Sequence, residues 1–148
     1  MPYDLALIRV AKSGRVAVAT IDAPPINVMT LQLYGELVQL SKEIEADDEV
    51  SVLVLRSADP DFFIAHFDVA AILAFPTDAP AERSAALNDF HAMGERFRTM
   101  PKVTIAQIEG RVGGGGSETV SAFDLRYGVI GKTRINQMEV PIGILPGG

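Results

Sequence analysis

The stretch that decides the fold is Ile108-Glu109-Gly110-Arg111-Val112-Gly113-Gly114-Gly115-Gly116-Ser117-Glu118. It joins an apolar segment, residues 103–108, to a predicted helix over residues 117–123 through a run of four glycines. Glycine has no side chain, so the backbone N–H groups of such a run approach a ligand closely. The N-terminus of a helix adds about half a positive charge. Together these features favour binding of an anion, or of an oxyanion that develops during a reaction.

The known nucleotide-binding patterns do not fit this stretch. The G-x-G-x-x-G fingerprint fails because the sixth position counted from Gly113 is Glu118, and the P-loop pattern fails because position 116 is glycine where lysine is expected. A carboxylate one turn into the helix would repel phosphate but suits acid/base chemistry beside an oxyanion site. The stretch alone has a simpler interpretation, a tightly packed glycine turn with a solvated Glu118. We expect the hydroxyls of Ser117 and Thr119 to cap the turn.

Apolar and amphipathic segments alternate outward from this stretch. The predicted strands cover residues 5–10, 16–21, 52–55, 103–108 and 125–130, and the predicted helices cover residues 30–46, 81–99 and 117–123, with a short helix from residue 68. The continuous apolar run at 52–55 is typical of a strand covered on both faces. The alternation of strands and helices predicts an α/β fold with parallel strand pairs.

The helix predicted over residues 30–46 has the clearest pattern. Leu33, Leu37, Leu40 and Ile44 follow one another at spacings of four and three, which places them on one helical face. Thr30 is a residue type that favours the N-cap position. We therefore expect this helix to pack its leucine face against the sheet.

Composition limits the class of protein. The chain has 148 residues, of which 48% are hydrophobic and 22% charged, and this is typical of one globular domain. Its longest apolar run, Val69–Phe75, is far too short to span a membrane. The net charge of −6 argues against nucleic-acid binding, and the lack of cysteine excludes disulfides and thiolate metal sites. Because no basic-then-apolar leader opens the chain, we expect a cytoplasmic protein without membrane contact.

Four separated segments carry a resemblance to a known family. They are PINVMT at residues 25–30, FIAHFD at 63–68, the glycine stretch at 108–118, and DLR at 124–126 followed by EVPIGILPGG at 139–148. In this order and spacing they resemble the crotonase superfamily, the enoyl-CoA hydratase/isomerase family. The resemblance covers essentially the whole chain.

The resemblance implies an architecture and an assembly. It implies a crotonase-like α/β spiral of repeated ββα units, with residues 1–148 forming a single core domain. Members of the family continue past this point into helices that complete the site and build trimers. We therefore expect a chain truncated before its C-terminal helices, and a homotrimer or a dimer of trimers at full length.

The resemblance also implies a substrate and site residues. The substrate would be an acyl-CoA thioester whose carbonyl oxygen lies between the backbone N–H groups of Phe67 and Gly115. Glu118 and Glu139 would be the acid/base residues, the backbone carbonyl of Ala65 would meet the adenine, and Asn27 would lie in the first turn on the coenzyme A side. No metal and no separate cofactor are implied, because coenzyme A is part of the substrate.

Two glutamates favour a hydratase, which is a lyase, over an isomerase. Adding water requires one group to take a proton from water while another protonates the α-carbon, whereas moving a double bond needs only one proton shuttle. An enoyl-CoA isomerase, another crotonase-type activity such as thioester hydrolysis, and a catalytically inactive scaffold stay open as alternatives.

One residue departs from the family pattern. His66 stands where the family usually has glycine, so a positive φ at this position would strain it. The residue is either a third titrating group at the site or a side chain turned away from it, and we favour the second interpretation.

Overall fold

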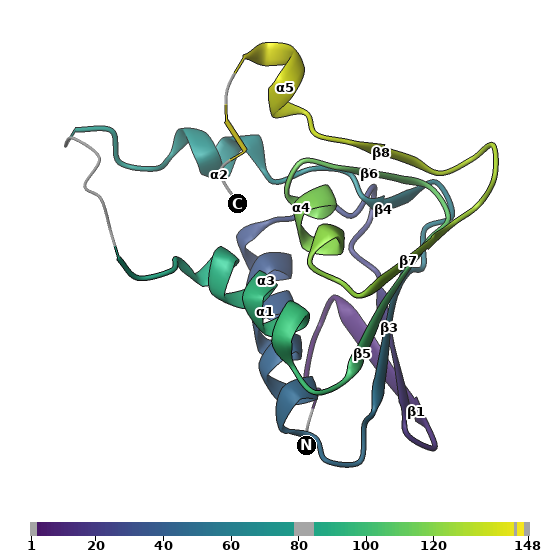
Figure 1. The fold of residues 1–148 in the computed structure, drawn as a ribbon. Coiled ribbons are helices and arrows are strands. Elements are labelled where there is room, and N and C mark those ends of the chain that lie inside the picture. Colours follow the sequence, from purple (N-terminus) through teal and green to yellow (C-terminus); the bar gives the residue numbers. More distant parts are fainter. Residues whose placement is uncertain (1–2, 79–84, 144, 147–148) are drawn as a thin grey trace.

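Two β-sheets organise the molecule in the computed structural model, which describes residues 3–78, 85–143 and 145–146 (Figure 1). Among these residues, the larger sheet has the strand order β1 (Ile8–Ser13), β2 (Val16–Ile21), β3 (Val52–Ser57), β5 (Val103–Ile108) and β7 (Leu125–Gly128). The smaller sheet has the order β4 (Phe62–Ile64), β6 (Arg111–Gly113) and β8 (Arg134–Asn136). Strands β1 and β2 form an antiparallel hairpin, and every other pair is parallel.

After the β1–β2 hairpin and the helix that follows it, the chain winds as a spiral in which each turn adds one strand to each sheet. The helices are α1 (Leu31–Ala46), α2 (Val69–Leu73), α3 (Asp89–Thr99), α4 (Gly115–Ser121) and α5 (Glu139–Ile142). Successive turns are β3–β4 followed by α2 and α3, then β5–β6–α4, then β7–β8–α5. This is the repeated ββα unit that the family resemblance implied. Because neighbouring turns stack, residues about one turn apart in sequence meet at the ends of the strands.

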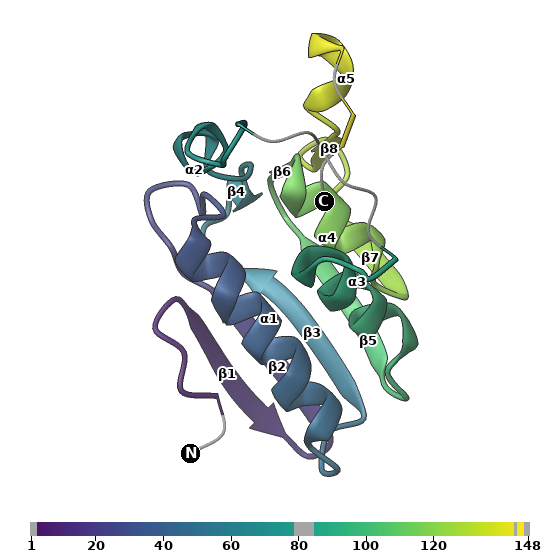
Figure 2. The same ribbon diagram turned by 90° about the vertical axis from the view of Figure 1, so that its left-hand side faces the viewer.

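Helices α1 and α3 pack side by side over one face of the larger sheet (Figure 2). The predicted leucine face of α1 is confirmed, because Leu33, Leu37, Leu40 and Ile44 are fully buried. The predicted cap is also confirmed, since Thr30 Oγ1 accepts a hydrogen bond from the N–H of Leu33 at 3.2 Å. Within the described part of the chain, no helix combines the length and the apolar character needed to cross a membrane.

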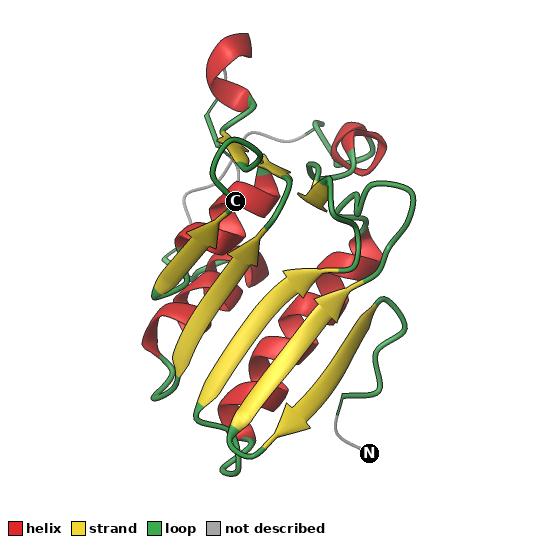
Figure 3. Ribbon diagram, turned by 90° about the vertical axis from the view of Figure 1, so that its right-hand side faces the viewer, coloured by secondary structure: helices red, strands yellow, loops and turns green. Residues whose placement is uncertain are grey.

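The opposite face of the larger sheet is not covered by any described helix (Figure 3). In β3, Leu53 and Leu55 are fully buried under the helices, whereas Val52 and Val54 on the other face are only half-buried. The prediction that this strand is covered on both faces was therefore wrong. A continuous apolar run has the same sequence pattern whether the second face of the strand is fully or only partly covered.

Several predicted boundaries were also wrong. Helix α3 begins at Asp89 and not at residue 81, because Asn88 Oδ1 accepts a hydrogen bond from the N–H of His91 at 2.8 Å and caps the helix there. Residues 81–84 of that prediction lie outside the described residues. Helix α4 begins two residues earlier than expected, at Gly115, and the first strand runs over Ile8–Ser13 and not over residues 5–10. Strands β4, β6 and β8 and helix α5 were not predicted.

Candidate active site

Close packing explains part of the glycine run. A Cβ atom at position 116 would lie 2.7 Å from the Cβ atom of Ile64, so only glycine lets α4 approach β4 this closely. Gly114 has a φ of +48°, in the region that favours glycine. The run is therefore a tightly packed turn, as the simpler interpretation held, but Glu118 behind it is half-buried beside a cavity and is not a solvated surface group.

The structure brings Phe67 and Gly115 into contact. A Cβ atom at position 115 would lie 3.6 Å from the Cβ atom of Phe67. The carbonyl of His66 accepts a hydrogen bond from the N–H of Met29 at 2.8 Å. Since the C=O and N–H of a trans peptide point in opposite directions, this bond turns the Phe67 N–H away from the Met29 backbone. Within the described residues, neither the Phe67 nor the Gly115 N–H donates a hydrogen bond to another residue, so both are available to an oxyanion.

Asn27 ties together the segments that lead to this loop. Its side chain is buried, its Oδ1 accepts from the N–H of Ala23 at 2.8 Å, and its Nδ2 donates to Ser57 Oγ at 2.8 Å. The same Nδ2 also contacts the carbonyl oxygens of Phe62 and Phe63. All its side-chain polar atoms are thus occupied inside the protein, and Asn27 positions β4 through them. Its contact with coenzyme A stays a prediction.

Ala65 lies one residue beyond β4. Its N–H donates to the carbonyl of Asn27 at 3.4 Å. Its own carbonyl oxygen would lie 2.7 Å from a Cβ atom at position 113, so this oxygen faces Gly113 of the neighbouring strand. The predicted contact of the Ala65 carbonyl with adenine stays a prediction.

Glu118 and Glu139 converge on one side chain, that of Gln137. Glu118 lies on α4, Glu139 is the first residue of α5, and Gln137 lies just after β8. The Gln137 Nε2 donates to Glu118 Oε1 at 2.8 Å and to Glu139 Oε2 at 2.7 Å. The two glutamates, 21 positions apart in sequence, therefore meet as the family resemblance implied. Their catalytic roles stay predictions. Sequence reasoning missed Gln137, whose only signal was its place two residues before Glu139.

The buried hydroxyl of Ser117 completes this network. Ser117 Oγ lies 2.5 Å from Gln137 Oε1 and 2.9 Å from the carbonyl oxygen of Gly114. Thr119 on the same helix donates from its Oγ1 to the carbonyl of Gly115 at 2.7 Å. The Thr119 hydroxyl therefore bonds to the glycine turn as predicted. The Ser117 hydroxyl, which has a single proton, lies within reach of both the turn and the amide that joins the two glutamates.

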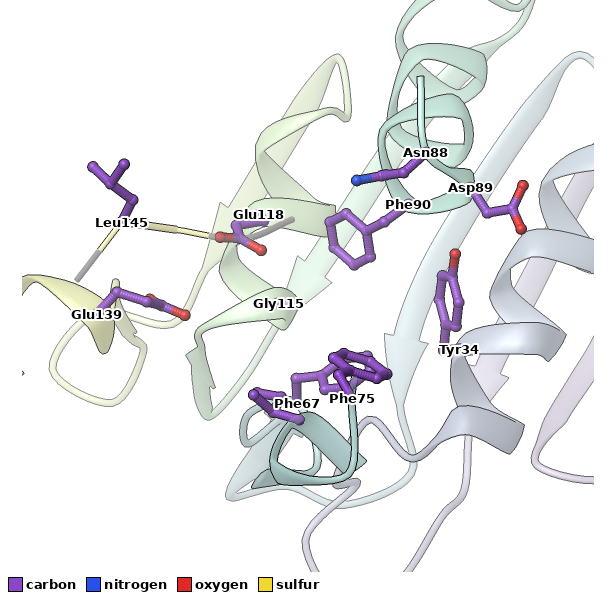
Figure 4. Close-up of a pocket in the computed structure, with 11 residues that line it drawn as sticks. Tyr34, Phe67, Phe75, Asn88, Asp89, Phe90, Gly115, Glu118, Glu139 and Leu145 are labelled. Atoms are coloured by element: carbon purple, nitrogen blue, oxygen red, sulfur yellow. The ribbon is translucent and has the colours of Figure 1, made fainter. Parts of the chain in front are cut away.

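A cavity of about 540 Å³ opens in front of the two glutamates (Figure 4). Glu118, Glu139 and Gly115 line one side of it, and aromatic rings line the other. The ring of Tyr34 lies edge-on to that of Phe67, with centroids 6.3 Å apart, and stacks on Phe90 at 5.9 Å. Burial, and then the nearby charge of Asp89, raise the pKa of Tyr34 and keep it neutral. The cavity thus joins an acidic end at Glu118 and Glu139 to a mainly aromatic end that also carries Asn88 and Asp89.

His66 adopts no strained backbone conformation. Among the described residues with side chains, only Tyr3 and Asn27 have positive φ values. The Nδ1 of His66 lies 2.7 Å from the carbonyl oxygen of Phe67, to which it donates a hydrogen bond. His66 is not among the residues that line the cavity. Its side chain is therefore turned to the neighbouring backbone, which fits the interpretation we favoured.

Comparison with protein families connects this geometry to known proteins. A family model described as enoyl-CoA hydratase/isomerase matches residues 11–148. Among solved structures, a protein from Streptomyces avermitilis superimposes with a TM-score of 0.81 at 35% identity, over 97% of this chain and 53% of that chain. The enoyl-CoA hydratase of Bacillus anthracis superimposes with a TM-score of 0.81 at 20% identity, over 96% of this chain and 54% of that chain, and so shares the fold.

Two relatives show how much of a whole protein this chain represents. A fatty acid oxidation complex subunit alpha from Idiomarina loihiensis is 33% identical over 99% of this chain and 21% of its own length. A short-chain-enoyl-CoA hydratase from Clostridium acetobutylicum is 30% identical over 97% of this chain and 54% of its own length. The chain therefore spans about a fifth of the first relative and about half of the second.

Proposed function

Because the chain belongs to the enoyl-CoA hydratase/isomerase family, we propose that the protein is an enoyl-CoA hydratase, a lyase that adds water syn across the double bond of a 2-enoyl-CoA thioester. One observation carries this proposal: Glu118 and Glu139 accept hydrogen bonds from the same Gln137 amide beside the available N–H groups of Phe67 and Gly115. The pairing of two carboxylates with two amides meets both electrostatic demands of the reaction.

The first demand is the negative charge that develops on the thioester oxygen. When water attacks the β-carbon, the electrons of the double bond move through the α-carbon onto this oxygen and form an enolate. The N–H groups of Phe67 and Gly115 would stabilise that charge without reorganising. Losing one such donor typically costs about 2.7–4 kcal/mol of transition-state stabilisation.

The second demand is the movement of two protons. The attacking water gives up one proton to an ionised glutamate, and the other glutamate, protonated, supplies a proton to the α-carbon. The two N–H bonds of the Gln137 amide diverge, so they hold the bonded oxygens of Glu118 and Glu139 apart on either side of the amide nitrogen. Such positioning supports an acid and a base acting on one water.

The aromatic end of the cavity would receive the acyl chain. Phe67, Phe75, Phe90 and Ile72 offer apolar surface next to the glutamates, which suits a hydrocarbon tail attached to a reacting thioester. Coenzyme A enters as part of the substrate, so the reaction needs no separate cofactor. The trimeric assembly and the cytoplasmic location stay predictions.

The deciding experiment follows the ultraviolet absorbance of the conjugated enoyl thioester in the presence of the full-length protein. We expect absorbance to fall for at least one acyl length and the product to be the 3-hydroxyacyl-CoA. Glu139→Gln should abolish most of this turnover. Glu109→Gln changes an exposed glutamate of the same stretch and should leave turnover unchanged.

The alternatives give different outcomes in the same assay. A product with a shifted double bond and no added water, formed also by the Glu139→Gln variant, would identify an isomerase. Release of free coenzyme A would identify a thioester hydrolase. Calorimetric titration with a non-hydrolysable acyl-CoA that gives no heat, together with constant absorbance, would identify an inactive scaffold.

A further inference from the structure

Gln137 uses both of its amide protons on the two glutamates. A side-chain amide has two N–H donors and one carbonyl acceptor, and here one donor goes to Glu118 and the other to Glu139. The amide holds the pair in this way only while its nitrogen faces the carboxylates. A rotation that exchanged nitrogen and oxygen would turn the amide carbonyl toward the two carboxyl groups and break both of these bonds.

Ser117 is the described residue that bonds to the opposite end of this amide. The Ser117 Oγ lies 2.5 Å from Gln137 Oε1, and Ser117 is only 3% exposed. A contact this short between two oxygens requires the hydroxyl proton to lie between them, so Ser117 donates and Gln137 accepts. The alternative acceptor, the carbonyl of Gly114, already accepts from the N–H of Glu118 at 3.1 Å. When Ser117 donates to Gln137, the Gly114 carbonyl therefore still has a hydrogen-bond donor, the N–H of Glu118.

The position of Ser117 makes it a rigid support. It lies within α4, next in sequence to Glu118, and its backbone carbonyl accepts from Ser121 Oγ at 2.7 Å. Ser117 thus bonds to the Gln137 amide, and this amide bonds to the carboxylate of Glu118, the next residue of the helix. Gln137, in contrast, lies between β8 and α5 and is half-buried. Its side chain has no described partner besides Ser117 and the two glutamates.

We propose that Ser117 is a positioning residue of the site, whose hydroxyl fixes the orientation of the Gln137 amide and thereby holds Glu118 and Glu139 at their working separation. Ser117 is not among the residues that line the cavity, so it would act on the reaction through Gln137 and not by touching the substrate. The link to catalysis rests on the proposed hydratase function, whereas the link from Ser117 to Gln137 does not depend on it.

The first test is independent of activity. In the ¹H–¹⁵N spectrum of the full-length protein, the side-chain amide protons of Gln137 should be shifted downfield and protected from exchange, because both bond to carboxylates. Ser117→Ala should remove the shift and the protection. Thr119→Val is the matched control, since it removes an equally buried hydroxyl of α4 that bonds only to the helix backbone, and it should leave both in place. Unchanged Gln137 signals in Ser117→Ala, or equal changes in both variants, would overturn the proposal.

The second test uses turnover. Ser117→Ala should lower kcat by up to about 10²-fold, the loss that small misplacements of catalytic groups produce, with little change in KM. In a Gln137→Met background the same substitution should have no further effect, because Ser117 acts through the amide. If the losses of kcat from Ser117→Ala and Gln137→Met were additive, Ser117 would not act through the Gln137 amide. If Ser117→Ala fails to fold, Ser117→Cys, with a similar size and a weaker donor, should give intermediate protection and intermediate kcat. Absence of turnover in the unsubstituted protein would refute the hydratase function while the spectroscopic test still decides the role of Ser117.

Discussion

Two carboxylates in the molecule, Asp47 and Glu139, are held by opposite kinds of partner. Asp47, at the end of α1, accepts hydrogen bonds from Lys12 Nζ at 2.9 Å and from Tyr3 Oη at 2.7 Å. The bond from the lysine, followed by that from the tyrosine, lowers the pKa of Asp47 to about 2. Glu139, in contrast, accepts from the neutral Gln137 amide and forms no ion pair with any described residue.

The difference fits the structural role of Asp47 and the acid/base role that we propose for Glu139. A cation beside a carboxylate stabilises only the ionised form, which suits a group that fastens the N-terminal segment to α1. A neutral amide orients a carboxylate while adding no charge that would lock its protonation state. A group that must gain and lose a proton in each catalytic cycle needs the second kind of partner.

The largest expected effect comes from removing an acid/base group. Glu118→Gln should lower kcat roughly 10²–10⁴-fold, the usual contribution of a positioned acid or base, while calorimetry shows nearly unchanged binding of an acyl-CoA. Asp47→Asn, which removes the cation-held carboxylate, should leave kcat unchanged. If Glu118→Gln and Asp47→Asn lowered kcat to a similar extent, the loss in Glu118→Gln could not be assigned to a missing acid/base group.

A smaller effect is expected when the neutral partner is exchanged for a charged one. Gln137→Lys places an ammonium beside Glu118 and Glu139, which favours their ionised forms, so the pH at which the pair takes up a proton should fall by about one to three units. The pH profile of kcat and a ¹³C titration of the glutamate carboxyls both measure this. The matched control is Gln39→Lys, because Gln39 donates to Glu43 in the same way at 2.8 Å but on an exposed surface. An unchanged pH profile in Gln137→Lys would argue against the pair as the proton-transfer groups.

The smallest effect concerns acid stability. The pKa of Asp47 in the folded protein, about 2, lies below its ordinary value of 3.8, so its contribution to folding is fully present above that value and is lost as the pH falls through 2. Asp47→Asn should therefore be less stable than the unsubstituted protein near neutral pH, and the two should converge at the acid limit. Denaturant unfolding at several pH values measures the difference. In Asp48→Asn, which removes a neighbouring carboxylate without a described side-chain partner, no such pH dependence is expected.

Local sequence signals were sufficient where local interactions decide the structure. Helix α1 was predictable because its cap, Thr30, and its leucine face act over a few residues. Helix α3 was predicted too long because the apolar Leu87 extends the helical pattern upstream, yet Asn88 caps the helix and Leu87 is 59% exposed. The three-residue strands β4, β6 and β8 gave no periodic signal, because strands this short are defined by their pairing with one another.

The site was predictable only in part for the same reason. The glycine stretch marked Glu118 by its own chemistry, but the partnership with Glu139 came from the family resemblance, since no local pattern joins residues 21 positions apart. Gln137 and the Ser117 contact could not be predicted, because an amide and a hydroxyl are ordinary side chains until the fold places them between two carboxylates.

The spiral also distributes rigidity unequally between the two halves of the site. Glu118 rises from α4, most of whose residues are buried, whereas Glu139 follows β7 and β8, whose residues are all exposed. Among the described strands, β7 also lies at the edge of the larger sheet. Opening of the pairing between β6 and β8 would separate the two acids, because Gln137 and Glu139 follow β8 directly. Hydrogen exchange in residues 134–136 should therefore report such openings, and their frequency would set the fraction of time during which the glutamate pair is assembled.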